Sequence, residues 1–159
     1  MKRVRRFLAA AAALALVLQA VRFPRNLGER HGAQSLERQH ALPAEIDQLL
    51  SRACYDCHSD RTVYPWYANV QPMGWLIEKH VIDGKARLNF SNFARLDAEA
   101  AAHHFQEIVE VVERHEMPLP SYLWLHPEAQ LSDAEQASLI AWAKEARRAA
   151  LATGASARP

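Results

Sequence analysis

The sequence predicts an all-α protein, for three reasons. Only five of the 159 residues are glycine, alanine is abundant, and runs of β-branched residues are scarce. Alanine is the strongest helix former, whereas strands are enriched in β-branched and aromatic residues. Three stretches place apolar residues at the spacing of one helix face. Together they predict a domain of roughly 110 residues with about four or five helices.

The first helix of the domain is expected to begin at Pro43, because proline suits the first turn of a helix. It leads directly into Cys54. Its apolar face consists of Ile46, Leu49, Leu50 and Ala53.

The middle of the chain is expected to alternate loops with one short helix. Residues 59–72 contain prolines and aromatic residues and have the composition of a loop. A helix is predicted from Met73 to Val81, ending near Gly84, because glycine commonly ends helices. The segment LNFSNF that follows is expected to be irregular.

Two longer helices are predicted from their caps. Asp97 can cap one that stops before Pro118. Ser132 and Glu135 form the capping box S-D-A-E of another. Their apolar stripes are Phe105, Ile108, Val109 and Val112, and then Leu139, Trp142, Ala143 and Ala146. The terminal segment TGASARP is expected to be frayed.

The N-terminus has the pattern of an export signal. Four basic residues open the chain, the first twenty residues include no acidic one, and an apolar stretch runs from Phe7 to Val21. That stretch is short for a full span of about 20 residues. Arg22 and Arg25 can reach the far interface and lengthen it. The residues before Val21 make a poor cleavage site, so an anchor is favoured over a cleaved signal, and both remain open.

The chain therefore divides into four predicted parts. Residues 1–22 are a signal anchor or signal peptide, 23–42 a polar tether, 43–150 the folded domain and 151–159 a flexible tail. Removing the four N-terminal basic residues from the total of 19 leaves 15, against 18 acidic residues. Because the domain has no basic stripe, nucleic acid is not expected among its partners.

The stretch CYDCH holds the chain's only two cysteines, Cys54 and Cys57, followed at once by His58. C-x-x-C-H is the attachment pattern of haem c, in which two thiols bond to the porphyrin edge and the histidine binds iron. A zinc site would need a further ligand, for which His103, His104 and His115 are candidates. A redox dithiol would want a βαβ context, and a structural disulfide gains nothing from the histidine. One covalent haem c is the favoured cofactor.

The second axial ligand of the iron is expected to be Met117. It opens the proline-held segment MPLPSY after a predicted helix, and methionine is a common partner of histidine in cytochromes c. The other candidates are Met73, His80, His115 and His126.

Further predictions concern the surroundings of the haem. A carbonyl between Pro65 and Pro72 is expected to orient His58 through its other ring nitrogen. Trp66, Trp75 and Phe90 are candidates for the haem edge, with ordinary core packing as an equal alternative.

The stretch from Cys54 to Phe93, together with EMPLPSYLWLHPEAQLSDAE and the helix ending in LIAWA, resembles the bacterial haem-binding domain family. LQAVRFPRN is similar to that family's membrane-proximal segment. The resemblance covers nearly the whole chain. It implies an exported, cytochrome c-like fold around one haem, attached at Cys54, Cys57 and His58, with Met117 as the methionine of the family's MP motif.

The expected function is single-electron transfer on the periplasmic face of the cytoplasmic membrane, with the N-terminal helix in the membrane and redox proteins as partners. No catalytic residues are expected, because two axial ligands from the chain leave no iron position for a substrate. The alternatives are a haem-based sensor or ligand-binding module, or a haem subunit of a peroxidase-like enzyme.

Overall fold

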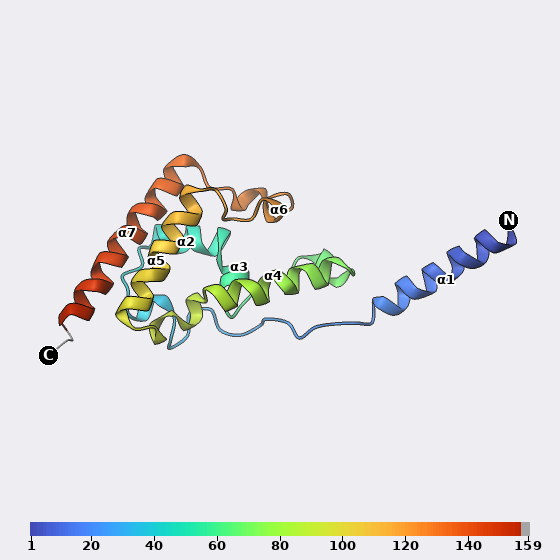
Figure 1. The fold of residues 1–159 in the computed structure, drawn as a ribbon, viewed down its shortest axis with the longest axis horizontal. Coiled ribbons are helices and arrows are strands. Elements are labelled where there is room, and N and C mark those ends of the chain that lie inside the picture. Colours follow the sequence, from blue (N-terminus) through green and yellow to red (C-terminus); the bar gives the residue numbers. More distant parts are fainter. Residues whose placement is uncertain (157–159) are drawn as a thin grey trace.

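The computed structural model describes residues 1–156 (Figure 1). Within that range all regular structure is helical apart from one isolated bridge between Leu27 and Arg61. The α-helices are α1 (Lys2–Leu18), α2 (Ala44–Ala53), α3 (Tyr55–His58), α4 (Met73–Arg87), α5 (Ala98–Glu113), α6 (Pro120–Leu123) and α7 (Asp133–Ser156). The 3₁₀ helices are η1 (Leu36–Arg38), η2 (Trp66–Asn69), η3 (Phe90–Arg95) and η4 (Pro127–Ala129).

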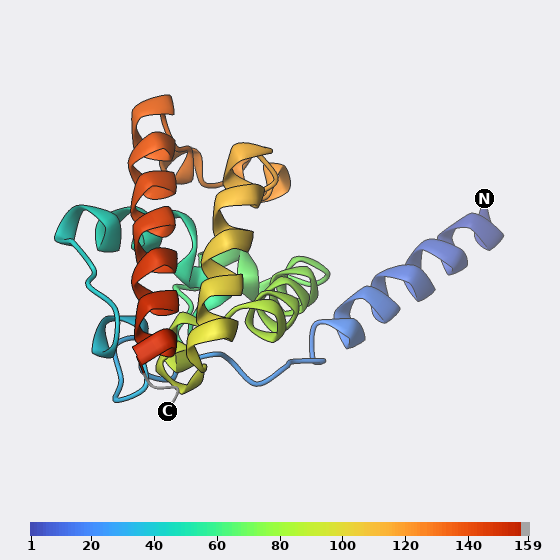
Figure 2. The ribbon, with the colours of Figure 1, turned by 60° about the vertical axis from the view of Figure 1, so that its left-hand side comes forward.

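The core lies where α5, α7 and α2 meet. Helices α5 and α7 run antiparallel, side by side, as Figures 1 and 2 both show. Phe105 is fully buried between them, with the ring of Trp142 edge-on at 5.6 Å between centroids. The apolar stripes predicted for these three helices are buried, apart from the partly buried Ala53.

The predicted helix starts are confirmed. Asp97 caps α5, its carboxylate accepting the N–H of Ala100 at 2.8 Å. Glu135 accepts the Ser132 N–H at 2.8 Å, and the Ser132 hydroxyl accepts the Glu135 N–H at 3.3 Å, so the capping box precedes α7. Helix α2 begins one residue after Pro43.

Helix α4 is longer than predicted. It runs past Gly84 to Arg87, so the prediction of a helix ending near Gly84 is wrong. The glycine serves close packing instead, because a Cβ at this position would lie 2.6 Å from the carbonyl oxygen of Cys57. The LNFSNF segment, predicted as irregular, forms most of η3.

The predicted tether at 23–42 is wrong from Asn26 onward. Leu36 is fully buried in the core, and the Trp142 indole donates to the Ala41 carbonyl at 3.0 Å. The Asn26 side chain donates to the Ser59 carbonyl at 2.8 Å. The composition is polar because several of these side chains bond to the domain.

The C-terminus also differs from its prediction. Helix α7 continues through Ser156, so residues 151–156 are helical rather than a frayed or flexible tail. A Cβ at Gly154 would lie 2.8 Å from Ala98, which places this last turn beside the start of α5. Residues 157–159 of the predicted tail lie outside the described range.

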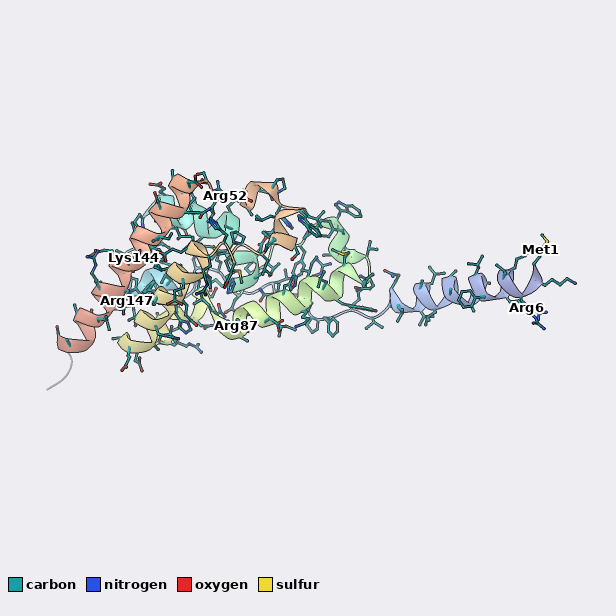
Figure 3. The ribbon with its side chains drawn as sticks, turned by 45° about the horizontal axis from the view of Figure 1, so that its top comes forward. Met1, Arg6, Arg52, Arg87, Lys144 and Arg147 are labelled. Atoms are coloured by element: carbon teal, nitrogen blue, oxygen red, sulfur yellow. The ribbon has the colours of Figure 1, made fainter. Side chains whose placement is uncertain are left out.

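Helix α1 stands apart from the domain, with Met1 and Arg6 at its free end (Figures 1 and 3). None of its residues is buried, and Phe7, Leu8, Leu14, Leu16 and Val17 are exposed. A search of residues 1–156 for a helix long and apolar enough to cross a membrane finds none.

Candidate functional site

The C-x-x-C-H motif lies at the end of α2 and on the single turn α3. The Cys54 carbonyl accepts the His58 N–H at 3.0 Å, which closes this turn. Residues three and four apart share a helix face, so the turn gathers both thiols and the imidazole on one side. Tyr55, on the other side, is buried in the core, and its hydroxyl donates to Asp47 at 2.9 Å.

His58 is oriented by a main-chain carbonyl. Its Nδ1 lies 3.0 Å from the carbonyl oxygen of Leu88, the residue that directly follows α4. A carbonyl only accepts, so Nδ1 carries the proton and Nε2 keeps its lone pair. The prediction of a carbonyl between Pro65 and Pro72 is wrong, because the close approach at Gly84 brings the end of α4, and not that loop, to the imidazole.

Two cavities adjoin at the motif. One has a volume of about 200 Å³ and is lined by Cys54, Cys57, His58 and Met117, among others. The other has a volume of about 250 Å³ and reaches toward His103, His104 and Glu107 at α5. Both are lined by Ala53, Cys54, His58, Arg87 and Met117.

Met117 reaches this site from the segment after α5. His115, with a φ of 54°, turns the chain out of the helix, and the Met117 N–H donates to the Val111 carbonyl at 3.3 Å. Of the other candidates for the second axial position, His80 lines only the smaller cavity. Met73, His115 and His126 line neither cavity.

A tyrosine and an aspartate join the Met117 segment to the motif. The Tyr122 hydroxyl, on α6, donates to Asp56 at 3.0 Å, and its ring stacks on His126 with centroids 3.9 Å apart. Asp56 also accepts the Val63 N–H at 3.0 Å. Neither residue was predicted from the sequence. Their only signal was position, inside the motif for Asp56 and within five residues of Met117 for Tyr122.

Burial keeps the motif's side chains uncharged. It raises the pKa of the Cys54 thiol to about 12, helped by Cys57. It raises the pKa of Cys57 to about 11, helped by Asp56. Burial also lowers the pKa of His58, although hydrogen bonding to the Leu88 and Gly84 carbonyls opposes this. A neutral imidazole with a free Nε2 lone pair is the form that binds a metal.

These residues fit an iron porphyrin. Two neutral thiols sit on one turn beside a histidine whose Nε2 is free, and a thioether borders the same space. The walls between these polar groups are largely apolar, including Leu50, Ile108 and Leu139. An apolar pocket with a few placed polar groups is the usual form of a cofactor site.

Comparison with known proteins agrees with this fit. The family model of the haem-binding domain matches residues 13–145. The chain belongs to the haem-binding domain family. The search of curated proteins gave no match, and neither did the search of solved structures.

The three aromatic residues predicted for the haem edge differ in whether they line a cavity at the motif. Phe90 lines the larger cavity, with its ring centroid 6.5 Å from that of His58. Trp66 is 78% exposed and lines neither cavity. Trp75 also lines neither, and its indole donates to the carbonyl of Val21 at 3.1 Å. Of the three predicted aromatics, only Phe90 borders the site.

Within the described residues, the histidines named as zinc candidates form no metal-holding group with the cysteines, although His103 and His104 line the larger cavity together with Cys54. His103 and His104 lie on α5, each within 4 Å of Glu107. His115 is exposed at the helix end. Within residues 1–156, no group of three or more His, Cys, Asp or Glu side chains is arranged to hold a metal ion.

Proposed function

We propose that this haem-binding protein is a mono-haem c-type cytochrome that transfers single electrons on the periplasmic face of the cytoplasmic membrane. The observation that carries the proposal is the shared cavity of Cys54, Cys57, His58 and Met117. Met117 lies 59 positions after His58 in the sequence, and both residues line the same cavity.

Each residue has a distinct role in this proposal. Cys54 and Cys57 tether the porphyrin covalently, and His58 offers Nε2 to the iron while Leu88 fixes its ring. Met117 offers a thioether from the opposite segment. The haem supplies reversible one-electron chemistry, with histidine and methionine together favouring the reduced iron.

Electron transfer is proposed rather than catalysis because the chain can supply both axial ligands. A substrate would then have no open position at the metal. The walls of the cavity are largely apolar, and an apolar shell limits the access of solvent to a bound metal, which also favours a carrier.

The proposed location follows from the N-terminus. Helix α1 exposes a long apolar surface, and its free end carries Lys2, Arg3, Arg5 and Arg6. A continuous exposed apolar surface is typical of a site that binds a membrane or another protein. A basic end followed by an apolar helix is the pattern of an export signal. We therefore place α1 in the cytoplasmic membrane and the domain in the periplasm.

The covalent haem is tested on a denaturing gel of protein made in a host that matures cytochromes c. Haem-dependent peroxidase staining is expected to follow the wild-type chain. It is expected to disappear from the double variant Cys54→Ala with Cys57→Ala. Gly32→Ala, which changes a residue remote from the motif, is the control and keeps the stain. A wild-type band without stain contradicts covalent attachment.

The second axial ligand is tested by absorption spectroscopy. The oxidised wild type is expected to show the weak long-wavelength band of sulfur-to-iron charge transfer, and Met117→Ala to lose it. Met73→Ala is the control and should retain it. A high-spin wild type that binds carbon monoxide readily contradicts the carrier and supports a ligand-binding role.

A further inference from the structure

The end of α1 is joined to the domain by side-chain hydrogen bonds. Gln19 and Gln71 pair, with the Gln71 N–H donating to the Gln19 side chain at 2.8 Å and the Gln19 amide donating to the Gln71 carbonyl at 3.3 Å. Gln71 and Trp75 both donate to the carbonyl of Val21, each at 3.1 Å. Residues that an export peptidase would remove or border are thus bonded to the folded domain.

Two arginines extend this junction. Arg22 donates to the Asn69 carbonyl at 2.7 Å, and Arg25 donates to the Asn69 side chain at 2.6 Å. The Arg25 guanidinium also lies 4.5 Å from the centre of the Tyr64 ring. Within residues 1–156, neither arginine lies within an ion-pair distance of a carboxylate. Their charges are therefore available to an anionic surface.

The same corner of the domain exposes apolar side chains. We call residues 19–25 and 66–76 the collar, because they surround the point where α1 meets the domain (Figure 1). The exposed large apolar residues of the collar are Val21, Phe23, Trp66, Val70 and Leu76. Tryptophan and phenylalanine beside arginine are the residue types that favour the boundary between lipid headgroups and acyl chains.

We infer that α1 is retained in the mature protein and that the collar binds the headgroup layer of the membrane, holding the domain in one orientation. This rests on the proposed membrane location. We infer a lipid surface as the binding partner because the collar adds exposed apolar side chains next to those of α1, and because Arg22 and Arg25 form no ion pair with a carboxylate within residues 1–156. The hydrogen bonds from Gln71 and Trp75 to Val21 prevent the domain from turning freely about the end of α1.

Retention of α1 is tested by the intact mass of the protein purified from membranes. The expected mass includes residue 1, or residue 2 if the initiator methionine is removed. A mature N-terminus at or after Ala20 overturns the inference, because Gln19 and its pairing with Gln71 would then be absent. The haem absorption spectrum of the same sample tests the proposed haem site separately.

Contact of the collar with lipid is tested by hydroxyl-radical footprinting. The full chain is placed in vesicles of phosphatidylethanolamine and phosphatidylglycerol, and the oxidation of each tryptophan is measured by mass spectrometry. Trp66 and Trp124 are a matched pair, since they are 78% and 83% exposed. Trp66 is expected to be oxidised several-fold more slowly than Trp124. Equal oxidation of the two overturns the inference.

The hydrogen bonds of the junction are tested by the double variant Gln71→Ala with Trp75→Phe. The variant is expected to stay in the membrane fraction while Trp66 loses its protection. The control Gln106→Ala removes a comparable amide bond, to Glu110 at 3.0 Å on α5, and should leave the protection intact. Unchanged protection in the double variant overturns the orienting role of the junction. Protection of Trp66 in a chain without haem spectrum contradicts the proposed cytochrome but supports the collar.

Discussion

At the scale of single residues, main-chain carbonyl groups orient and surround the side chains of the site. The Leu88 carbonyl fixes His58, and the Cys57 carbonyl lies against Gly84. Main-chain groups do not titrate, so a histidine oriented by them keeps its tautomer over a wide pH range. One glycine therefore decides whether α4 can approach closely enough for its last carbonyl to reach the imidazole.

Gly84→Ala is expected to destabilise the protein and to lower its haem content. A Cβ would lie 2.6 Å from the Cys57 carbonyl oxygen, and overpacking of this kind costs about 1–3 kcal/mol. Alanine regains only about 1 kcal/mol through its higher helix propensity. Urea unfolding and haem absorbance per chain measure the two effects.

The control for this prediction is Gly32→Ala. The nearest atom to a Cβ at Gly32 is 3.5 Å away, on Glu29, so this change should stay within about 0.5 kcal/mol of wild type. If Gly84→Ala were as stable as Gly32→Ala, the close approach of α4 to α3 would be wrong.

Tyr122→Phe is expected to lower the free energy of unfolding by about 1–2 kcal/mol, because Asp56 loses a hydrogen bond in a partly buried place. The phenyl ring keeps the stacking on His126. Burial raises the pKa of Tyr122, and Asp56 adds to this, so the hydroxyl remains a donor at neutral pH. Urea unfolding of both proteins measures the loss.

Tyr122→Leu provides the comparison, since it removes the stacking as well and should cost more than Tyr122→Phe. Equal stability of wild type and Tyr122→Phe would show that the bond to Asp56 does not hold α6 against α3.

The site residues that belong to a known motif were predicted from the sequence. The neighbouring residues that orient them became visible only in the structure. Cys54, Cys57 and His58 follow one another in a known pattern, and Met117 opens a proline-held segment. The structure places all four around one cavity, while their bonds to haem stay a prediction. Leu88 and Tyr122 were not predictable, because their roles depend on how α4 and α6 pack and not on residue type.

At the scale of helices, the capping box of α7 also connects this helix to α2. Glu135 belongs to the capping box of α7 and also accepts from Arg52 of α2 at 2.6 Å. Hydrogen bonding from the Ser132 N–H, with Arg52 and the Ser132 hydroxyl, lowers the pKa of Glu135 to about 2. The start of α7 is thereby linked to the helix that leads into the motif.

The acid stability of the protein is expected to depend on Glu135. Its folded pKa of about 2 lies below the ordinary value of 4.5, so the folded state binds the proton less readily than the unfolded chain. The stabilisation is fully present above pH 4.5 and is lost as the pH falls toward 2. Urea unfolding of wild type and Glu135→Gln at several pH values measures this.

The two proteins should therefore differ most at neutral pH and converge in acid. If the difference in unfolding free energy between the two proteins were the same at neutral and at acid pH, the Glu135 carboxylate would not be the source of the pH dependence.

Helix starts were predictable, as were the end of α2 at Cys54 and the end of α5 before Pro118, but the ends of α4 and α7 were not. Asp97 and the Ser132–Glu135 box act through neighbours within three residues, so they are visible in the sequence. Gly84 resembled a helix end but lies inside α4, and Gly154 lies inside α7. Both glycines allow close approach to another helix, and such contacts depend on the tertiary fold.

At the scale of the whole molecule, the chain before α2 wraps the domain instead of only linking it to α1. Ser35 and Leu36 are buried, and the Gln39 side chain donates to the Ala94 carbonyl at 2.8 Å. The wrap reaches from the core to the collar, so it connects the helices that line the cavity to the corner where α1 meets the domain. The domain proper therefore begins near Asn26 rather than at Pro43.

Leu36→Ala is the decisive test of this wrap. Leu36 is 0% exposed within the core, where loss of a leucine side chain costs about 2–5 kcal/mol. Leu27→Ala makes the same change nearby at a residue that is 62% exposed, and should cost no more than about 0.5 kcal/mol. Urea unfolding of the haem-loaded protein compares the two. If residues 26–42 were a free tether, neither substitution would change the free energy of unfolding. If they belong to the core, only Leu36→Ala lowers it.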